Sequence, residues 1–349
     1  MMNALFVLIL GVCLTLLLRW GFKTLPQEQW QIMATVPRRK EGLGLWVGAN
    51  LTYYGLITAS SGILAMITFL VLMASVNVPV RASLPMLGIV LALCLPATRV
   101  VARLVEGKQH TSSIAAGVFV GLLLAPMVVA VIDACGGDRT AASMSPTLAA
   151  MTVAYVLGEG LGRLACISFG CCYGKPITEV GPVARRVFER FHFAFYGETK
   201  KIAYASGLEG IKVVPIQAIT AALYLAIGLA GMFLFLESFY RITYALTILG
   251  SQTWRVYSEN LRADERGGGR LLTTYQKMAL GGIGYAVGVL TLLPPTVDLT
   301  PDIALGIAAL WDPVVIVFLQ AIWAVMFVVT GWSMVTGSVL TFHVHRDRI

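Results

Sequence analysis

Two separate segments of this chain place arginine and glutamate at helical spacing within or at the end of apolar stretches. Arg163 follows Glu159 by four residues, and Arg255, Glu259 and Arg262 follow one another at intervals of four and three. Residues at these intervals share one face of a helix. An arginine at membrane depth is costly and usually marks a function or a paired partner. Because its planar, permanently charged fork binds phosphate through paired hydrogen bonds, the two segments predict a site for the negatively charged head of a lipid.

Each group also has a purely structural interpretation. Glu159 and Arg163 can form a buried ion pair that lowers the cost of burying either charge, and the two residues by themselves favour this reading. The stripe from Arg255 to Arg262 can be a helix end whose side chains extend to water. That reading suits Arg262, which acidic residues follow, better than the deeper Arg255.

Three further polar features carry weaker signals. Gln217 begins an apolar span and can offer its amide to a headgroup, although most glutamines at such positions are simply solvated. His110 lies in a polar junction before another span, where a structural role is commoner than proton transfer. Cys166, Cys171 and Cys172 have no histidine or carboxylate beside them in the sequence. We therefore interpret them as thiols that pack between helices, and we predict neither a metal nor a cofactor.

The composition indicates which elements must position these residues. Of 349 residues, 57% are hydrophobic and only 13% are charged, and the mean hydropathy is +0.79, whereas soluble domains carry roughly 25% charged residues. A polytopic membrane protein is the class that fits. The net charge of +8 suits anionic headgroups. Because the positive residues are spread between apolar spans, no nucleic-acid partner is expected.

About nine stretches are long and apolar enough to cross a bilayer as helices. They are 3–22, 46–76, 83–103, 113–134, 145–170, 213–236, 240–260, 274–294 and 313–340. We therefore expect an all-α polytopic bundle. The first stretch has no basic start or cleavage site, which predicts a retained span. The polar segment 171–212 mixes basic and aromatic residues, and it is either an interfacial arm or an ordinary basic loop.

Lysine and arginine fall mostly in alternate connections, beginning with residues 23–45. The other connections hold mainly Arg81, Arg139 and Arg241. The positive-inside rule therefore predicts an outside N-terminus and a cytoplasmic position for the loop after Arg163.

Several of these segments resemble a known family. The run Gly162-Arg163-Leu164-Ala165-Cys166 through Gly170-Cys171-Cys172-Tyr173-Gly174 is similar to the signature of bacterial prolipoprotein diacylglyceryl transferases, in its Gly-Cys-Cys-Tyr-Gly form. Further resemblances, in chain order, are Tyr53-Tyr54-Gly55 to a Tyr-Gly, Arg99 to a Gly-Gly-Arg, Pro215-Ile216-Gln217 to a Pro-Ser-Gln, Arg255 through Arg262 to an Arg-x-x-x-Glu-x-x-Arg, and Thr274-Tyr275-Gln276 to the start of the last helix.

The resemblance implies a seven-span core at 46–294, which includes the arm 171–212. It leaves an extra span and basic loop at 1–45 and an extra span and tail at 295–349. It implies an enzyme of the bacterial inner membrane that moves the diacylglyceryl group of phosphatidylglycerol to the cysteine thiol of a prolipoprotein lipobox. In that family the signature loop faces outward, opposite to the side that the lysine and arginine distribution indicates.

The resemblance also assigns roles. The catalytic residues would be Arg163, Arg255, Glu259 and His110, with Glu259 orienting the arginines. The lipid-binding residues would be Gln217, Arg262, Gly174, Tyr173, Glu159 and Arg99. The chain departs from the family pattern where Cys166 replaces an asparagine, Thr111-Ser112-Ser113 replaces His-Gly-Gly, and Thr220 replaces a glutamate. The phosphate clamp is kept while candidate proton-handling groups are lost. The pattern therefore predicts transfer to a lipoprotein thiol, transfer to another acceptor, or phospholipid binding without chemistry.

Overall fold

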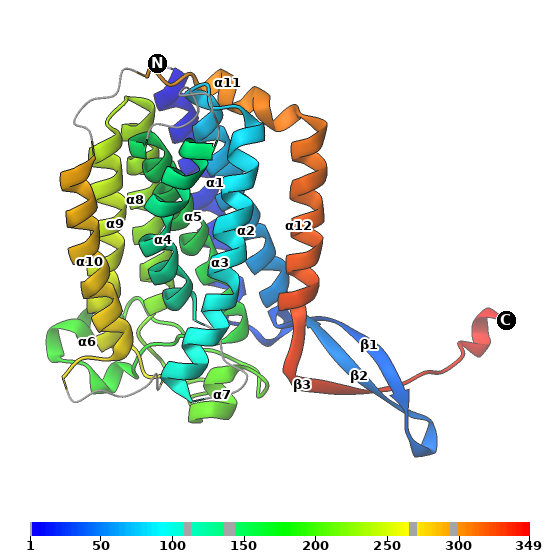
Figure 1. Cartoon of the computed structure of the whole chain (residues 1–349). Coiled ribbons are helices and arrows are strands. Elements are labelled where there is room, and N and C mark those ends of the chain that lie inside the picture. The colour runs from blue at the N-terminus through cyan, green and yellow to red at the C-terminus, as the bar shows by residue number, and fades with distance from the viewer. Residues whose placement is uncertain (1, 108–112, 136–143, 265–270, 294–298) are drawn as a thin grey trace.

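The computed structural model describes residues 2–107, 113–135, 144–264, 271–293 and 299–349, which are mostly helical. The long helices lie side by side in one bundle (Figure 1). They are α1 (Met2–Thr24), α2 (Tyr53–Ser75), α3 (Val80–Glu106), α4 (Ile114–Cys135), α5 (Met144–Phe169), α8 (Ile216–Leu236), α9 (Tyr240–Ser258), α10 (Thr274–Leu292) and α12 (Pro313–Gly331). Seven of them, α1 to α5, α8 and α12, are long and apolar enough to cross a membrane. The prediction of a bundle of several membrane-length apolar helices is confirmed, and the count of nine spans stays a prediction.

Helix α5 is the central element and packs against α2, α8 and α9. Small residues allow these close contacts. A Cβ atom added at Gly158 would lie 2.7 Å from the Cβ of Ala65 in α2, and one added at Gly228 of α8 would lie 2.5 Å from the side chain of Leu157. Because lipid tails are as apolar as leucine, helices in a membrane associate through such close packing rather than through the hydrophobic effect.

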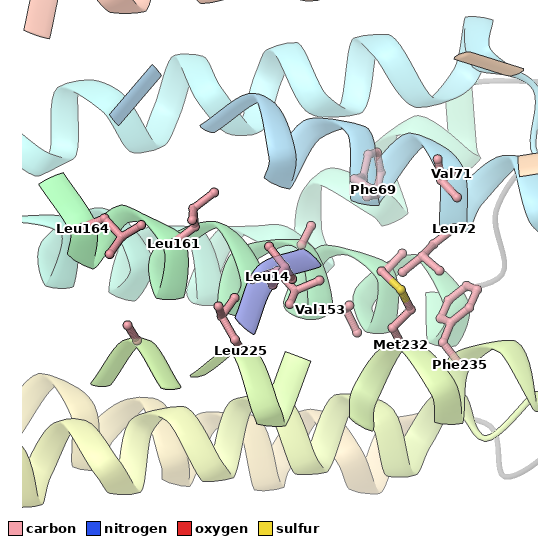
Figure 2. Close-up of a cluster of buried hydrophobic side chains, with 14 of the residues drawn as sticks. Leu14, Phe69, Val71, Leu72, Val153, Leu161, Leu164, Leu225, Met232 and Phe235 are labelled. Carbon is pink, nitrogen blue, oxygen red and sulfur yellow. The ribbon is translucent and has the colours of Figure 1, made fainter. Parts of the chain in front are cut away.

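Apolar side chains from α1, α2, α5 and α8 form the main buried cluster, which Figure 2 shows. Leu14 contributes from α1, Phe69 from α2, Leu161 from α5 and Leu225 from α8. This packing fixes the rotation of α5 and α8 and so determines which of their side chains face the interior of the bundle.

A three-stranded antiparallel sheet extends from one end of the bundle (Figure 1). Its strands are β1 (Ile32–Lys40), β2 (Leu45–Thr52) and β3 (Trp332–Thr341), in the order β1-β2-β3. Asn50 of β2 is fully buried, and its Oδ1 accepts hydrogen bonds from Thr35 of β1 at 2.9 Å and from Ser338 of β3 at 2.6 Å. The sheet therefore joins segments from both ends of the sequence to the strand that precedes α2.

The all-α expectation is wrong for these strands. The predicted span 46–76 begins as β2 and becomes helical only at Tyr53, and the predicted span 313–340 leaves its helix at Gly331. A close approach explains the second boundary, because a Cβ atom at Gly55 would overlap the backbone of Gly331. The hydroxyl of Thr52 also donates to the Gly331 carbonyl oxygen at 2.9 Å. After this contact the chain pairs with β2 instead of continuing as a helix.

The segment 171–212 folds against the bundle at the end where the sheet emerges (Figure 1). It contains two short helices, α6 (Pro182–Phe188) and α7 (Lys201–Ser206). Phe193 and Phe195 are buried in the core, whereas Phe191 is exposed. The opposite end of the bundle carries α11 (Ile303–Ala308). The described connections richest in lysine and arginine lie at the end that carries the sheet, α6 and α7.

Candidate anion-binding cavity

A cavity of about 300 Å³ lies at the sheet end of the bundle, where α5 and α9 end and α8 begins. This volume is at the low end of the roughly 300–1,000 Å³ typical of small-molecule pockets. Its charged lining residues are Arg163, Lys201, Arg255, Arg262 and Glu259. Four cations and one carboxylate therefore face the cavity, which favours an anionic ligand.

A single carboxylate joins the two arginines predicted to form a clamp. Oε1 of Glu159 accepts a hydrogen bond from Nη2 of Arg163, and its Oε2 accepts one from Nη2 of Arg255 at 2.5 Å. The Glu159 side chain is only 2% exposed, and the arginine side chains are 14% and 11% exposed. Two guanidinium groups from α5 and α9 thus share one negative charge. The three side chains together keep a net positive charge beside the cavity.

Three buried polar atoms at the cavity have no hydrogen-bond partner among the described residues. They are Nε of Arg163, Nε of Arg255 and Oε1 of Gln217. Nε2 of the Gln217 amide donates to the Cys171 carbonyl oxygen at 2.9 Å, and this hydrogen bond fixes the orientation of the amide. Because buried polar groups are normally satisfied, two donors and one acceptor are available here to a ligand that presents both oxygen atoms and hydroxyl groups.

The loop after α5 has an unusual backbone that places its side chains around the cavity. Gly170 and Cys172 both have left-handed conformations, with φ of 70° and 56°. Gly174 pairs with Arg262 across an isolated β-bridge. A Cβ atom at Gly174 would lie 2.8 Å from the Cβ of Val214 and would overlap the Val214 carbonyl oxygen. The loop therefore requires glycine at 174, and the β-bridge at this glycine positions Arg262.

The segment after α9 differs from the predicted single stripe. Helix α9 ends at Ser258, residues Glu259–Leu261 form a 3₁₀ turn, and Arg262 is extended. Arg262 does not reach bulk water, since its side chain is 9% exposed, and it donates two hydrogen bonds to Asp264 at 2.8 and 2.7 Å. Glu259 lines the cavity but forms no ion pair with any described residue. The carboxylate that joins the arginines is Glu159.

A buried lysine closes the end of α5 behind the loop. Lys200 is fully buried, and its Nζ donates to the Ser168 carbonyl oxygen at 2.6 Å and to the Leu25 carbonyl oxygen at 3.2 Å. Burial lowers the pKa of Lys200 to about 8, although Glu28 opposes this shift. The ammonium thus satisfies carbonyl groups at the ends of α5 and α1 and holds these ends together.

The structure places the predicted site residues at different positions. Arg163, Arg255, Arg262, Glu259 and Gln217 line the cavity, and Glu159 lies against two of them. Tyr173 and Gly174 belong to the loop but do not line the cavity, and the Tyr173 hydroxyl is paired with Ser206 at 2.5 Å. Arg99 is exposed on α3 and does not line the cavity, so the structure does not place it in the site. His110 lies outside the described residues.

The sequence interpretation missed an aromatic partner of the clamp. The Tyr155 hydroxyl accepts a hydrogen bond from Arg255 at 3.2 Å. Its position four residues before Glu159 is the same helical spacing that identified Arg163, so the signal was present. Residues of β3 that line the cavity, from Trp332 to Val335, had no such signal, because their position depends on pairing between distant strands.

No protein-family model matches this chain, and no curated protein matches it. These two comparisons therefore assign the chain to no family.

Proposed function

We propose that this protein is a transferase of the bacterial inner membrane that moves the diacylglyceryl group of phosphatidylglycerol to the cysteine thiol of a lipoprotein. The observation that carries the proposal is the meeting of Arg163 and Arg255 on Glu159 at the edge of a cationic cavity. The arginines come from two segments that are far apart in the sequence. Each retains a buried Nε–H that no described residue accepts.

The chemistry of such a transfer needs an anion stabiliser. The thiol sulfur attacks the glyceryl carbon that bears the phosphate, a carbon–sulfur bond forms, and the carbon–oxygen bond to the phosphate breaks. The bonding electron pair leaves with glycerol phosphate, so negative charge grows on the departing group. Arg163 and Arg255 are placed to stabilise that charge electrostatically. Glu259 is the one carboxylate among the described lining residues, and we assign it the thiol proton.

The proposal is tested with purified protein in lipid vesicles, labelled phosphatidylglycerol and a lipobox peptide. Formation of a thioether-linked product supports the transferase. Arg163→Ala and Arg255→Ala should abolish the product while the protein remains in the membrane. Arg241→Ala is the matched control, because Arg241 also lies in α9 but does not line the cavity. Its guanidinium donates to the Leu290 carbonyl oxygen at 2.9 Å. Wild-type turnover by either clamp variant would refute the assignment.

A second candidate is phospholipid binding without chemistry. Thr220 stands where the family has a glutamate and lines the cavity, so a hydroxyl replaces a carboxylate at that position. Its hydroxyl donates to the Ile216 carbonyl oxygen at 2.7 Å and accepts from the Trp254 indole at 3.0 Å. Under this alternative, labelled phosphatidylglycerol stays intact and bound, and binding is lost in the same two arginine variants.

A further inference from the structure

Three cysteines meet at the wall of the same cavity. Cys166 lies in the last turns of α5, and Cys171 and Cys172 lie in the loop that follows. Their Sγ atoms all lie within 4.8 Å of one another, and all three residues line the cavity. Cys166 and Cys172 are buried, and Cys171 is half-buried. Packing between helices, which the sequence favoured for these thiols, does not by itself require three sulfur atoms to converge.

The backbone of the loop is built so that the thiols converge. The Cys171 amide donates to the Cys166 carbonyl oxygen at 3.0 Å, which folds the chain back directly after the helix. Cys172 then adopts φ of 56°, a left-handed conformation that is uncommon for residues other than glycine. Strain of this kind persists only where the surrounding structure over-determines it, and it clusters at functional sites.

We propose that Cys166, Cys171 and Cys172 form a binding site for one thiophilic metal ion, with Zn²⁺ as the best fit and a fourth coordination position open to the cavity. A Zn–S bond of about 2.3 Å with tetrahedral angles places sulfur atoms about 3.8 Å apart. The observed upper limit of 4.8 Å therefore requires each pair to close by no more than about 1 Å. Thiolate sulfur selects zinc and copper(I) over hard cations.

The charges around the site suit this ion. On binding, each thiol releases its proton to solvent as its sulfur–zinc bond forms. Three thiolates and one Zn²⁺ carry a net charge of −1, and Arg163 and Arg262 line the same cavity. Three thiolates and one exchangeable ligand in the cavity fill the four positions of tetrahedral zinc, so a histidine or carboxylate ligand is not required. The combination of three protein ligands and one exchangeable position is the arrangement of catalytic zinc sites.

The test uses Co²⁺ as a coloured substitute for Zn²⁺ in the purified, fully reduced full-length protein. We expect one Co²⁺ per chain, a sulfur-to-cobalt charge-transfer band, and complete displacement of the band by Zn²⁺. Cys171→Ser, at the half-buried position, should weaken Co²⁺ binding by more than about tenfold. Even the loss of a residue that only hydrogen-bonds a metal ligand lowers metal affinity about 10–100-fold. Cys94→Ser is the matched control, because Cys94 lies in α3 outside the cavity.

Absence of the charge-transfer band in the reduced wild-type protein would overturn the proposal, whatever the variants do. Equal Co²⁺ affinity in Cys171→Ser and Cys94→Ser would overturn it as well. A disulfide between two of the three cysteines in protein alkylated directly in the membrane would show a redox pair instead. None of these measurements uses lipid transfer, so the metal site and the proposed function can fail independently.

Discussion

Replacing Glu159 with glutamine separates a structural ion pair from a lipid clamp. Glutamine keeps the shape of the side chain, and its single oxygen can still accept from one arginine. Its amide nitrogen then faces the other guanidinium, so a donor opposes a donor. Because the Glu159 side chain is 2% exposed, water cannot compensate for the lost charge, and two buried cations are left without a counter-ion.

The expected loss is large. Removing one partner of a buried ion pair costs about 3–5 kcal/mol, and Glu159→Gln should lower the free energy of unfolding by that amount in uncharged micelles. A bound phosphate group would restore a negative charge beside Arg163 and Arg255. A hydrogen bond to a charged group contributes about 1.5–3 kcal/mol, so phosphatidylglycerol should recover at least about 1.5 kcal/mol of the loss.

The assay is urea unfolding in micelles that contain either phosphatidylglycerol or phosphatidylcholine, followed by tryptophan fluorescence. Glu189→Gln is the matched control, because Glu189 and its partner Arg185 are each 52% exposed and 3.1 Å apart. An exposed pair contributes about 0–1 kcal/mol, so this variant should change little in either lipid.

Two outcomes would contradict the reasoning. If Glu159→Gln unfolds at the same urea concentration as the wild type, the two arginines do not depend on Glu159. If the loss is equal in both lipids, the arginines form a structural ion pair and do not bind an anionic headgroup.

Three further changes have defined outcomes. Burial lowers the pKa of Lys200 in the folded state to about 8, so between pH 8 and about 10.4 the unfolded state binds more protons than the folded state. The free energy of unfolding of the wild type should therefore rise with pH in this window. Lys200→Met should abolish that rise in unfolding curves measured as a function of pH. Gly174→Ala should lower the unfolding free energy by about 1–3 kcal/mol through overlap with Val214. Gly181→Ala meets open space and changes only the N-cap of α6, so it should cost less than about 1 kcal/mol. Arg99→Ala should retain lipid binding and transfer, since Arg99 is exposed on α3; loss of either activity would show that the cavity is not the whole site.

The sequence predicted the bundle and one half of the clamp because both depend on local pattern. The length of an apolar run determines whether a helix can cross a bilayer. Helical spacing places Glu159 and Arg163 on one face, and the structure confirms their contact. The cost of a buried arginine singled out Arg163 and Arg255 without any knowledge of their neighbours.

Only the tertiary structure decided how these parts meet. Arg255 reaches Glu159 rather than Glu259 because the packing of α5 against α9 fixes which carboxylate lies opposite. The strand β3 pairs with β2, although the two strands lie near opposite ends of the sequence. Periodicity within either segment cannot reveal such a partner. The three thiols converge because the chain folds back at Gly170 and the Cys171 amide donates to the Cys166 carbonyl oxygen, after which Cys172 is left-handed. Contacts of this kind depend on the relative placement of distant segments, and spacing along the sequence carries no information about that placement.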